Sequence, residues 1–157
     1  MPGGEAITAE GLRTLEAELH ELETTARRAM AERIKAAREL GDLKENAEYH
    51  IAKEDQAHLE TKIRRMRQRL GAAVVVDADP SAVGFGFGRT AEVLDETSGM
   101  SRTWTIVGPT EANVAESRIS AESPVGKALL GRAVGDTVAV ETPSGTRRYR
   151  IARLLPS

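Results

Sequence analysis

The stretch GDLKENAEY (residues 41–49) interrupts a region that otherwise favours continuous helix. Between Thr8 and Leu70 there is no proline, and the only glycines are Gly11 and Gly41. Gly41 stands where a glycine commonly follows the end of a helix. The residues on either side are largely alanine and charged residues, which favour helix. We therefore predict two long helices joined by a short turn, the first capped at its start by Thr8.

Each predicted helix carries one narrow apolar stripe with charged residues on both sides. Such a stripe suits the seam between two helices better than a globular bundle, so we expect an antiparallel coiled-coil hairpin. Its first helix, Ala9 to Leu40, would be about 48 Å long. The second stripe has a missing step near polar Asp55 and Gln56. The stripes are Leu12, Leu15, Leu19, Leu22, Ala26, Met30, Ile34 and Ala37, then Ala52, Leu59, Ile63, Met66 and Leu70.

After Leu70 the pattern changes to short runs of alternating apolar residues, which are typical of strands. Val74–Val76 indicates a short strand or connector, and Ser123 with Pro124 indicates the capped start of a short helix over Val125–Leu130. We expect an α+β fold with a hairpin domain over residues 1–76, a linker over 77–83 and a small β-rich domain over 84–157. The predicted strands are Thr90–Leu94, Thr103–Val107, Val138–Thr142 and Arg147–Leu154.

Composition limits the function and the location. The 157 residues carry a net charge of −2, so the total charge offers no surplus for nonspecific nucleic-acid binding. There is no cysteine, which excludes disulfides and thiolate metal sites. Residues 1–5 lack a signal-peptide pattern, and no apolar run is long enough to cross a membrane. We expect a cytoplasmic protein without a membrane partner.

The turn carries two acids, Asp42 and Glu45, and two interpretations remain open for them. Asp42 followed three residues later by Glu45 is close to a capping box, which would satisfy the first amides of the second helix. Alternatively, two exposed carboxylates could complete a Mg²⁺ site. Because Mg²⁺ takes one or two carboxylates and fills its other positions with water and phosphate, a partner would supply the remaining ligands.

Residues 41–49, with Arg38 before them and His50 and Lys53 after them, resemble the signature of the bacterial Gre transcript-cleavage factors, and most closely the GreA type. The resemblance continues through residues 119–124, 128–131 and 138–145, so it covers nearly the whole chain. It implies that the second domain is FKBP-like and docks on RNA polymerase, with Ser123 and Pro124 in the docking loop.

The resemblance also implies a mechanism. The hairpin of this family enters the secondary channel of RNA polymerase when the enzyme has backtracked on its RNA. Asp42 and Glu45 match the acids that help to hold the second catalytic Mg²⁺. Arg38 and Lys53 match a basic spot that faces the RNA 3′ end, although the family usually has arginine at the second position. The protein would then be a monomeric activator of the polymerase and no enzyme alone, without a cofactor of its own.

Three other functions remain open. A regulator could enter the channel without promoting cleavage, although the intact pair of acids argues against it. A prolyl isomerase could use the FKBP-like domain, but the second half offers only Phe85, Phe87, Trp104 and Tyr149 as aromatic walls. A free coiled-coil scaffold would need neither the acids nor their neighbouring cations. The basic run from Lys62 to Arg69 has no role assigned by the resemblance.

Overall fold

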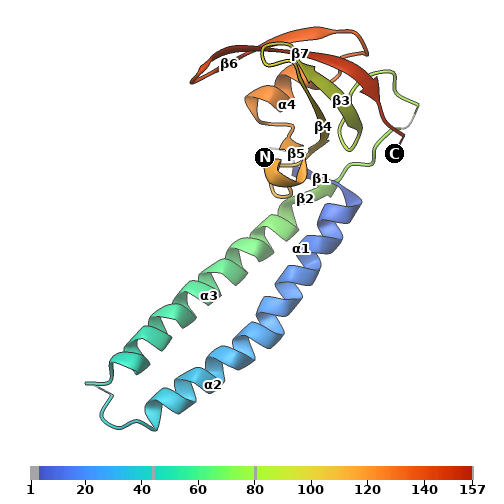
Figure 1. Cartoon of the computed structure of the whole chain (residues 1–157). Coiled ribbons are helices and arrows are strands. Elements are labelled where there is room, and N and C mark those ends of the chain that lie inside the picture. Colours follow the sequence, from blue (N-terminus) through green and yellow to red (C-terminus); the bar gives the residue numbers. More distant parts are fainter. Residues whose placement is uncertain (1–3, 44, 80, 157) are drawn as a thin grey trace. The chain divides into compact units, whose positions relative to one another are not determined.

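The computed structural model describes residues 4–43, 45–79 and 81–156 (Figure 1). Lys44 of the turn and Pro80 of the predicted linker lie outside the described residues. The chain divides into two compact units. One unit is Leu12–Ala72, and the other joins the N-terminal residues through Gly11 to the chain from Ala73 onward. The α+β fold class is confirmed, with a helical hairpin and a curled β-sheet, whereas the FKBP-like character of the second domain stays a prediction.

The hairpin has one arm built from three consecutive helical segments and a second arm that is a single helix. The first arm comprises α1 (Ala9–Glu21), the π-helical segment η1 (Leu22–Ala26) and α2 (Arg27–Arg38), and the second is α3 (Ala47–Ala72). Figure 1 shows the arms running in opposite directions. Every residue of the two predicted stripes is buried or half-buried. The apolar seam is therefore confirmed, although the first arm ends at Arg38 and not at Leu40.

Ion pairs cross the seam and explain the gap in the second stripe. Asp55 occupies the missing apolar step, and its carboxylate lies 2.8 Å from the guanidinium of Arg33. Residues that come later in the first arm pair with residues that come earlier in α3, which is the order that antiparallel arms require. These pairs include Glu23 with Arg67, Arg27 with Glu60, and Arg33 with Asp55.

The π-helical segment η1 corrects the direction of the buried face. The buried Ile34 lies 15 positions after the buried Leu19, and a straight α-helix would turn them about 60° apart. A π turn contains more residues, so it reduces this offset. The hydroxyl of Thr24 donates a hydrogen bond to the carbonyl oxygen of His20 at 2.7 Å beside this turn. The sequence analysis did not predict this segment.

The two ends of the hairpin continue into a pair of short parallel strands. β1 (Glu5–Ile7) pairs with β2 (Ala73–Val75), and the N–H of Val76 donates to the carbonyl oxygen of Ile7 at 2.9 Å. Ile7 is 1% exposed, so this small sheet has a packed side. The strand at Ala73–Val75 agrees with the prediction of a short strand at this place, but β1 was missed.

Thr8 and Glu111 fasten the start of α1 within the same unit. Thr8 caps the helix as predicted, because its Oγ1 accepts a hydrogen bond from the N–H of Gly11 at 3.0 Å. The Oε2 atom of Glu111 accepts hydrogen bonds from the N–H of Thr8 at 2.7 Å and from the N–H of Gly108 at 3.2 Å. The hydroxyl of Thr8 also donates to the Oε1 atom of Glu111.

The larger sheet has five strands in the order β5-β4-β3-β7-β6. The β4–β5 pair is parallel and the others are antiparallel. The four predicted strands are present with small shifts of their ends, and β5 was not predicted. The strands are β3 (Thr90–Asp95), β4 (Met100–Val107), β5 (Arg118–Ser120), β6 (Thr137–Thr142) and β7 (Gly145–Leu154), and the short helices are η2 (Val114–Glu116) and α4 (Pro124–Leu129).

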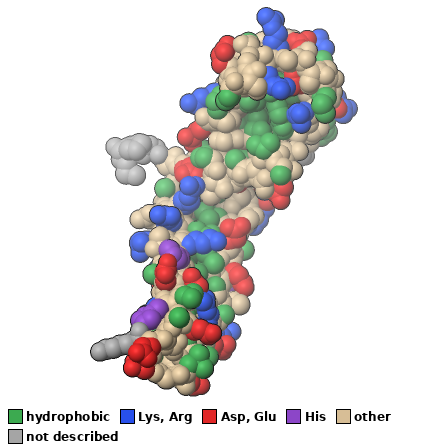
Figure 2. Space-filling model, turned by 60° about the vertical axis from the view of Figure 1, so that its left-hand side comes forward, with side chains coloured by type: hydrophobic (Ala, Val, Ile, Leu, Met, Phe, Trp, Pro, Cys, Tyr) green, Lys and Arg blue, Asp and Glu red, His purple; other side chains and the backbone are tan. Residues whose placement is uncertain are grey.

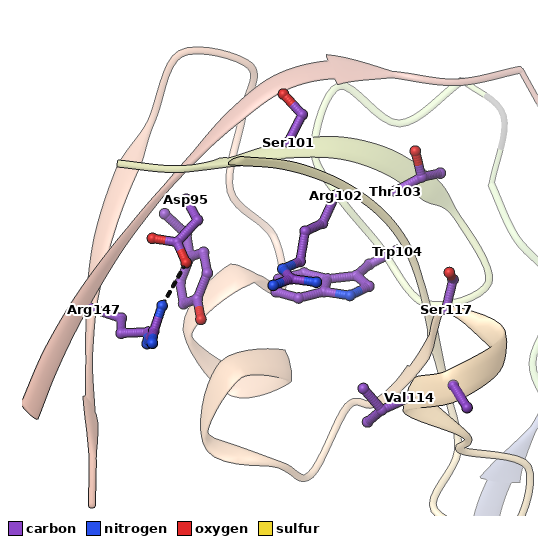
Figure 3. Close-up of a pocket in the computed structure, with 10 residues that line it drawn as sticks. Asp95, Ser101, Arg102, Thr103, Trp104, Val114, Ser117 and Arg147 are labelled. Carbon is purple, nitrogen blue, oxygen red and sulfur yellow. Dashed lines mark hydrogen bonds and ion pairs between the residues drawn. The ribbon is translucent and has the colours of Figure 1, made fainter. Parts of the chain in front are cut away.

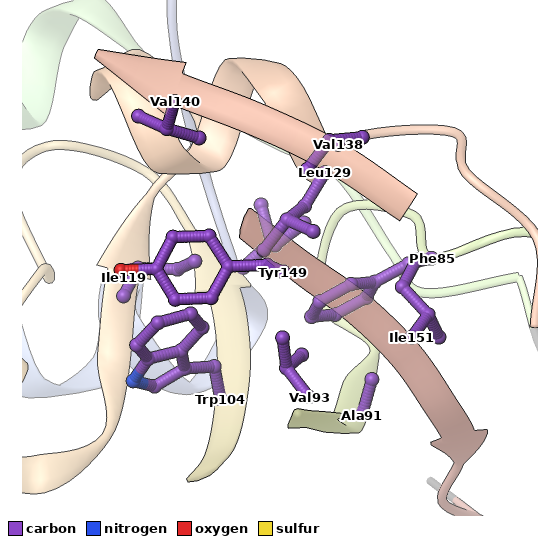
Figure 4. Packing of buried hydrophobic residues seen from close by; sticks show 11 residues of the cluster. Phe85, Ala91, Val93, Trp104, Ile119, Leu129, Val138, Val140, Tyr149 and Ile151 are labelled. Carbon is purple, nitrogen blue, oxygen red and sulfur yellow. The ribbon is translucent and has the colours of Figure 1, made fainter. Parts of the chain in front are cut away.

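One hydrophobic core fills the curled sheet and α4 (Figure 4). Phe85 and Leu129 are fully buried, and the rings of Trp104 and Tyr149 meet edge to face with their centroids 5.3 Å apart. Phe85 therefore fills the core and does not form a wall of a surface pocket. This unit has its own core, separate from the apolar seam of the hairpin.

Candidate functional site at the hairpin tip

The tip is the loop between the end of α2 at Arg38 and the start of α3 at Ala47. Gly41 has a φ of +123°, a backbone conformation that favours glycine. The N–H of Glu45 donates to the carbonyl oxygen of Asp42 at 3.3 Å, so a backbone hydrogen bond joins the two acids. Both acids are exposed. Figure 2 shows acidic side chains gathered at this end of the hairpin.

Asn46, and not Asp42, caps the second arm. The Oδ1 atom of Asn46 accepts a hydrogen bond from the N–H of Tyr49 at 3.0 Å, which is the contact of an N-cap residue. The predicted capping box at Asp42 and Glu45 is therefore wrong, because α3 begins at Ala47 and both acids precede its cap. The sequence did contain a signal, since asparagine is among the best N-caps and Glu48 follows it in the first turn.

In the sequence, the two predicted basic residues flank Tyr49: Arg38 precedes it and Lys53 follows it. The guanidinium carbon of Arg38 lies 5.9 Å from the ring centroid of Tyr49, close enough for a cation–π contact. Lys53 is four residues after Tyr49, so both occupy one face of α3. The Nζ atom of Lys53 donates a hydrogen bond to Gln56 at 3.0 Å. Both cations are exposed.

The acid pair matches Mg²⁺ in chemistry but is incomplete as a site. Carboxylate oxygens are the ligands that Mg²⁺ prefers, and two of them leave most of an octahedral shell unfilled. In the ranges 4–43, 45–79 and 81–156 there is no group of three or more His, Cys, Asp or Glu residues that could hold a metal ion. The two acids therefore supply only part of a Mg²⁺ coordination shell.

Ser123 and Pro124 begin α4. The Oγ atom of Ser123 accepts a hydrogen bond from the N–H of Gly126 at 3.1 Å and donates one to the carbonyl oxygen of Ser120 at 2.7 Å. Pro124 occupies the first turn and is exposed. The predicted capped helix is confirmed, and Ser123 has a structural task in it. A docking role for the two residues stays a prediction.

A pocket of about 540 Å³ opens on the curled sheet (Figure 3). Trp104 and Tyr149 line it, and Arg147 binds the carboxylate of Asp95 at its side with a 2.8 Å contact. Burial raises the pKa of Asp95, but hydrogen bonds from the N–H groups of Ser98 and Thr97 and from Arg147 outweigh burial and hold its pKa below the usual value. The sequence analysis did not single out this buried acid.

The basic run near the base of the hairpin is exposed at Lys62, Arg64 and Arg65. Arg67 is also exposed, and its guanidinium pairs with Glu23 across the seam. Part of this run therefore stabilises the hairpin. None of the described helices is long and apolar enough to cross a membrane.

The fold and the tip define a class of protein: a long helical hairpin with exposed acids at its turn, and a separate unit built on a curled five-stranded sheet. Two family descriptions match the chain in that order. "Transcription elongation factor, N-terminal" covers residues 5–75, and "Transcription elongation factor, GreA/GreB, C-term" covers residues 81–155. The chain belongs to the GreA/GreB family of transcription elongation factors.

Two relatives named transcription elongation factor GreA agree with this assignment. The chain is 46% identical over 149 residues to transcription elongation factor GreA of Chloroflexus aggregans, covering 94% of this chain and 95% of the relative. It is 48% identical over 148 residues to the GreA of Roseiflexus sp., covering 92% and 93%. Among solved structures, it is similar to transcription factor Gfh1, at 31% identity and a TM-score of 0.43 over 98% of this chain and 99% of that one.

Proposed function

We propose that the hairpin enters the secondary channel of RNA polymerase and supplies Asp42 and Glu45 to the polymerase active site, where they stimulate cleavage of the 3′ end of backtracked RNA. The observation that carries this proposal is the division of tasks at the tip. Asn46 caps α3, and both acids lie exposed ahead of it. A purely structural pair of acids would be expected at the cap itself.

The chemistry follows from what the polymerase and the tip each supply. When bound between the two molecules, a second Mg²⁺ would stabilise the attacking and leaving oxygens of an in-line phosphodiester hydrolysis. Asp42 and Glu45 contribute carboxylate oxygens and can orient the attacking water by accepting its hydrogen bonds. The factor turns over no substrate alone, because two exposed carboxylates hold Mg²⁺ weakly without further ligands.

The basic spot has a supporting role in this proposal. Arg38 and Lys53 offer positive charge to the phosphates of the extruded RNA. Lys53 gives a point charge without the paired geometry of arginine, so Arg38 is the stronger candidate for a two-point phosphate contact. Ser123 and Pro124 are proposed to belong to the surface that docks on the polymerase, with the exposed Pro124 ring as the contact.

The test uses backtracked elongation complexes with end-labelled RNA. We expect Asp42→Asn to bind polymerase normally and to lose about 100-fold of the stimulated cleavage rate, because an amide is a poor Mg²⁺ ligand. Glu48→Gln is the matched control: it also removes an exposed acid, but from the first turn of α3. It should keep near-normal cleavage. Full cleavage by Asp42→Asn would refute the metal role.

A second comparison separates RNA contact from docking. Arg38→Ala should weaken cleavage and leave polymerase affinity unchanged, whereas Lys35→Ala, an exposed cation in the same last turn of α2, should change neither. A native protein that binds polymerase tightly but stimulates no cleavage would favour the alternative, a channel-binding regulator without cleavage activity.

A further inference from the structure

Asn46 binds both arms of the hairpin with the two ends of one side chain. Its Oδ1 atom accepts from the N–H of Tyr49 in the first turn of α3, at 3.0 Å. Its Nδ2 atom donates to the carbonyl oxygen of Ala37 in the last turns of α2. A side-chain amide carries both an acceptor and a donor, so a single residue can close this bridge. Asn46 is half-buried, whereas the acids beside it are exposed.

The two acids lie inside the loop that this bridge closes. Glu45 is joined directly to Asn46 by a peptide bond. The carbonyl oxygen of Asp42 in turn accepts the N–H of Glu45 at 3.3 Å. At the other end, the carbonyl oxygen of Ala37 also accepts the N–H of Leu40 at 3.1 Å. The backbone that carries both carboxylates therefore begins and ends at the same clamp, which lowers its conformational entropy.

The same clamp fixes the basic side of the tip. Arg38 directly follows Ala37, and its guanidinium carbon lies 5.9 Å from the ring centroid of Tyr49. The N–H of Tyr49 is the group that Asn46 caps. The positions of the Arg38 guanidinium, the Tyr49 ring and the two acids therefore all depend on the side chain of Asn46. These groups come from both arms and from the loop between them.

We propose that Asn46 is a positioning residue that holds Asp42 and Glu45 in the geometry needed to complete a shared Mg²⁺ site, an inference that rests on the function proposed above. Asn46 contacts neither the metal nor the RNA in this proposal. It acts through the acids. The reaction rate depends steeply on their position, because a displacement of about 1 Å among the reacting groups can cost about 100-fold in rate.

Asn46→Ser separates the two bonds of the clamp. Serine is also a good N-cap, so the bond to Tyr49 is retained, whereas its short hydroxyl cannot also donate to Ala37 across the turn. Asn113→Ser is the matched control, because Asn113 caps η2 in the other unit through the same kind of bond, to the N–H of Ala115 at 3.1 Å. Both variants remove one amide and add no charge.

We expect Asn46→Ser to keep native helicity and polymerase affinity. At saturating factor, its cleavage rate should fall about tenfold, and it should need a higher Mg²⁺ concentration for half-maximal stimulation. Asn113→Ser should match the native protein in both. Native rate and native Mg²⁺ dependence for Asn46→Ser would overturn the proposal, as would a loss confined to polymerase affinity, which would make Asn46 a docking contact.

Failure of the underlying function would be recognised from the native protein, which would then show no stimulation. In that case ¹⁵N relaxation of residues 39–45 decides the positioning role. Lower order parameters in Asn46→Ser than in the native protein would support it, and unchanged order parameters would overturn it.

Discussion

Replacing Gly108 by alanine tests whether the N-terminal strand is held against the β-sheet unit by close backbone contact. A Cβ atom at this position would lie 1.9 Å from the carbonyl oxygen of Ala6 in β1. Real Cβ atoms essentially never come closer than 3.0 Å, so β1 would have to retreat by about 1.1 Å. The clash is with backbone, and no side-chain rotation relieves it.

The cost has two parts. Overpacking of this kind costs about 1–3 kcal/mol. A retreat of β1 also stretches the hydrogen bonds of Thr8 to Glu111, and bonds to a charged acceptor contribute about 1.5 kcal/mol or more each. We therefore expect Gly108→Ala to destabilise its unit by about 3 kcal/mol. With a urea slope of about 2 kcal/mol/M, the unfolding midpoint should fall by about 1.5 M.

Urea unfolding followed by tryptophan fluorescence measures this directly, because Trp104 is the only tryptophan and lies in the core of the same unit. Gly71→Ala serves as the control, since a Cβ there meets nothing within 4 Å. Gly71 is in α3, so alanine should leave the fluorescence midpoint unchanged and slightly raise helix stability by about 0.5 kcal/mol. An unchanged midpoint for Gly108→Ala would refute the close contact.

Two further perturbations test the packing of each unit. Asp95→Asn should destabilise the β-sheet unit by about 2 kcal/mol at pH 7, because it weakens the bonds from Arg147 and two backbone N–H groups to a carboxylate that is 1% exposed. Since the pKa of Asp95 is lower in the folded state, its contribution is complete above the unfolded value of about 3.9 and is lost as the pH falls through the folded value, so the native and Asp95→Asn urea midpoints should converge in acid. Ala52→Leu should cost the hairpin about 2 kcal/mol by overpacking a fully buried seam position, and should lower the melting temperature measured by circular dichroism at 222 nm. Ile51→Ala, at the neighbouring position that is 53% exposed, should change that temperature little.

The sequence predicted those parts of the fold that are governed by local periodicity. The stripes at Leu15 and Ile63 repeat every three or four residues because each arm buries one face, and the buried positions follow that repeat. The strand at Val138–Thr142 alternates because one of its faces meets the core. In each case the burial pattern is visible in neighbouring residues.

The missed features depend on residues that are distant in the chain. β1 is three residues long and finds its partner at Ala73–Val75, so no local repeat marks it. The ion-pair partner of the buried Asp95 is Arg147, which lies on another strand and far along the chain. The sequence left a cap at Asp42 open because Asp42 and Glu45 match the spacing of a capping box, and that pattern does not reveal that the helix begins after Asn46.

The hairpin begins after β1 and ends at β2, and these two strands are paired. Both arms can therefore change in length together without separating the two points where the hairpin begins and ends. Removing one heptad from each arm would shorten the hairpin by about 10 Å and leave the same faces in register. The distance between the acidic turn and the opposite end of the hairpin is therefore set by the number of helical turns in each arm. Lengthening or shortening both arms would change the distance between the acidic turn and the opposite end of the hairpin while preserving the chemistry of the carboxylates.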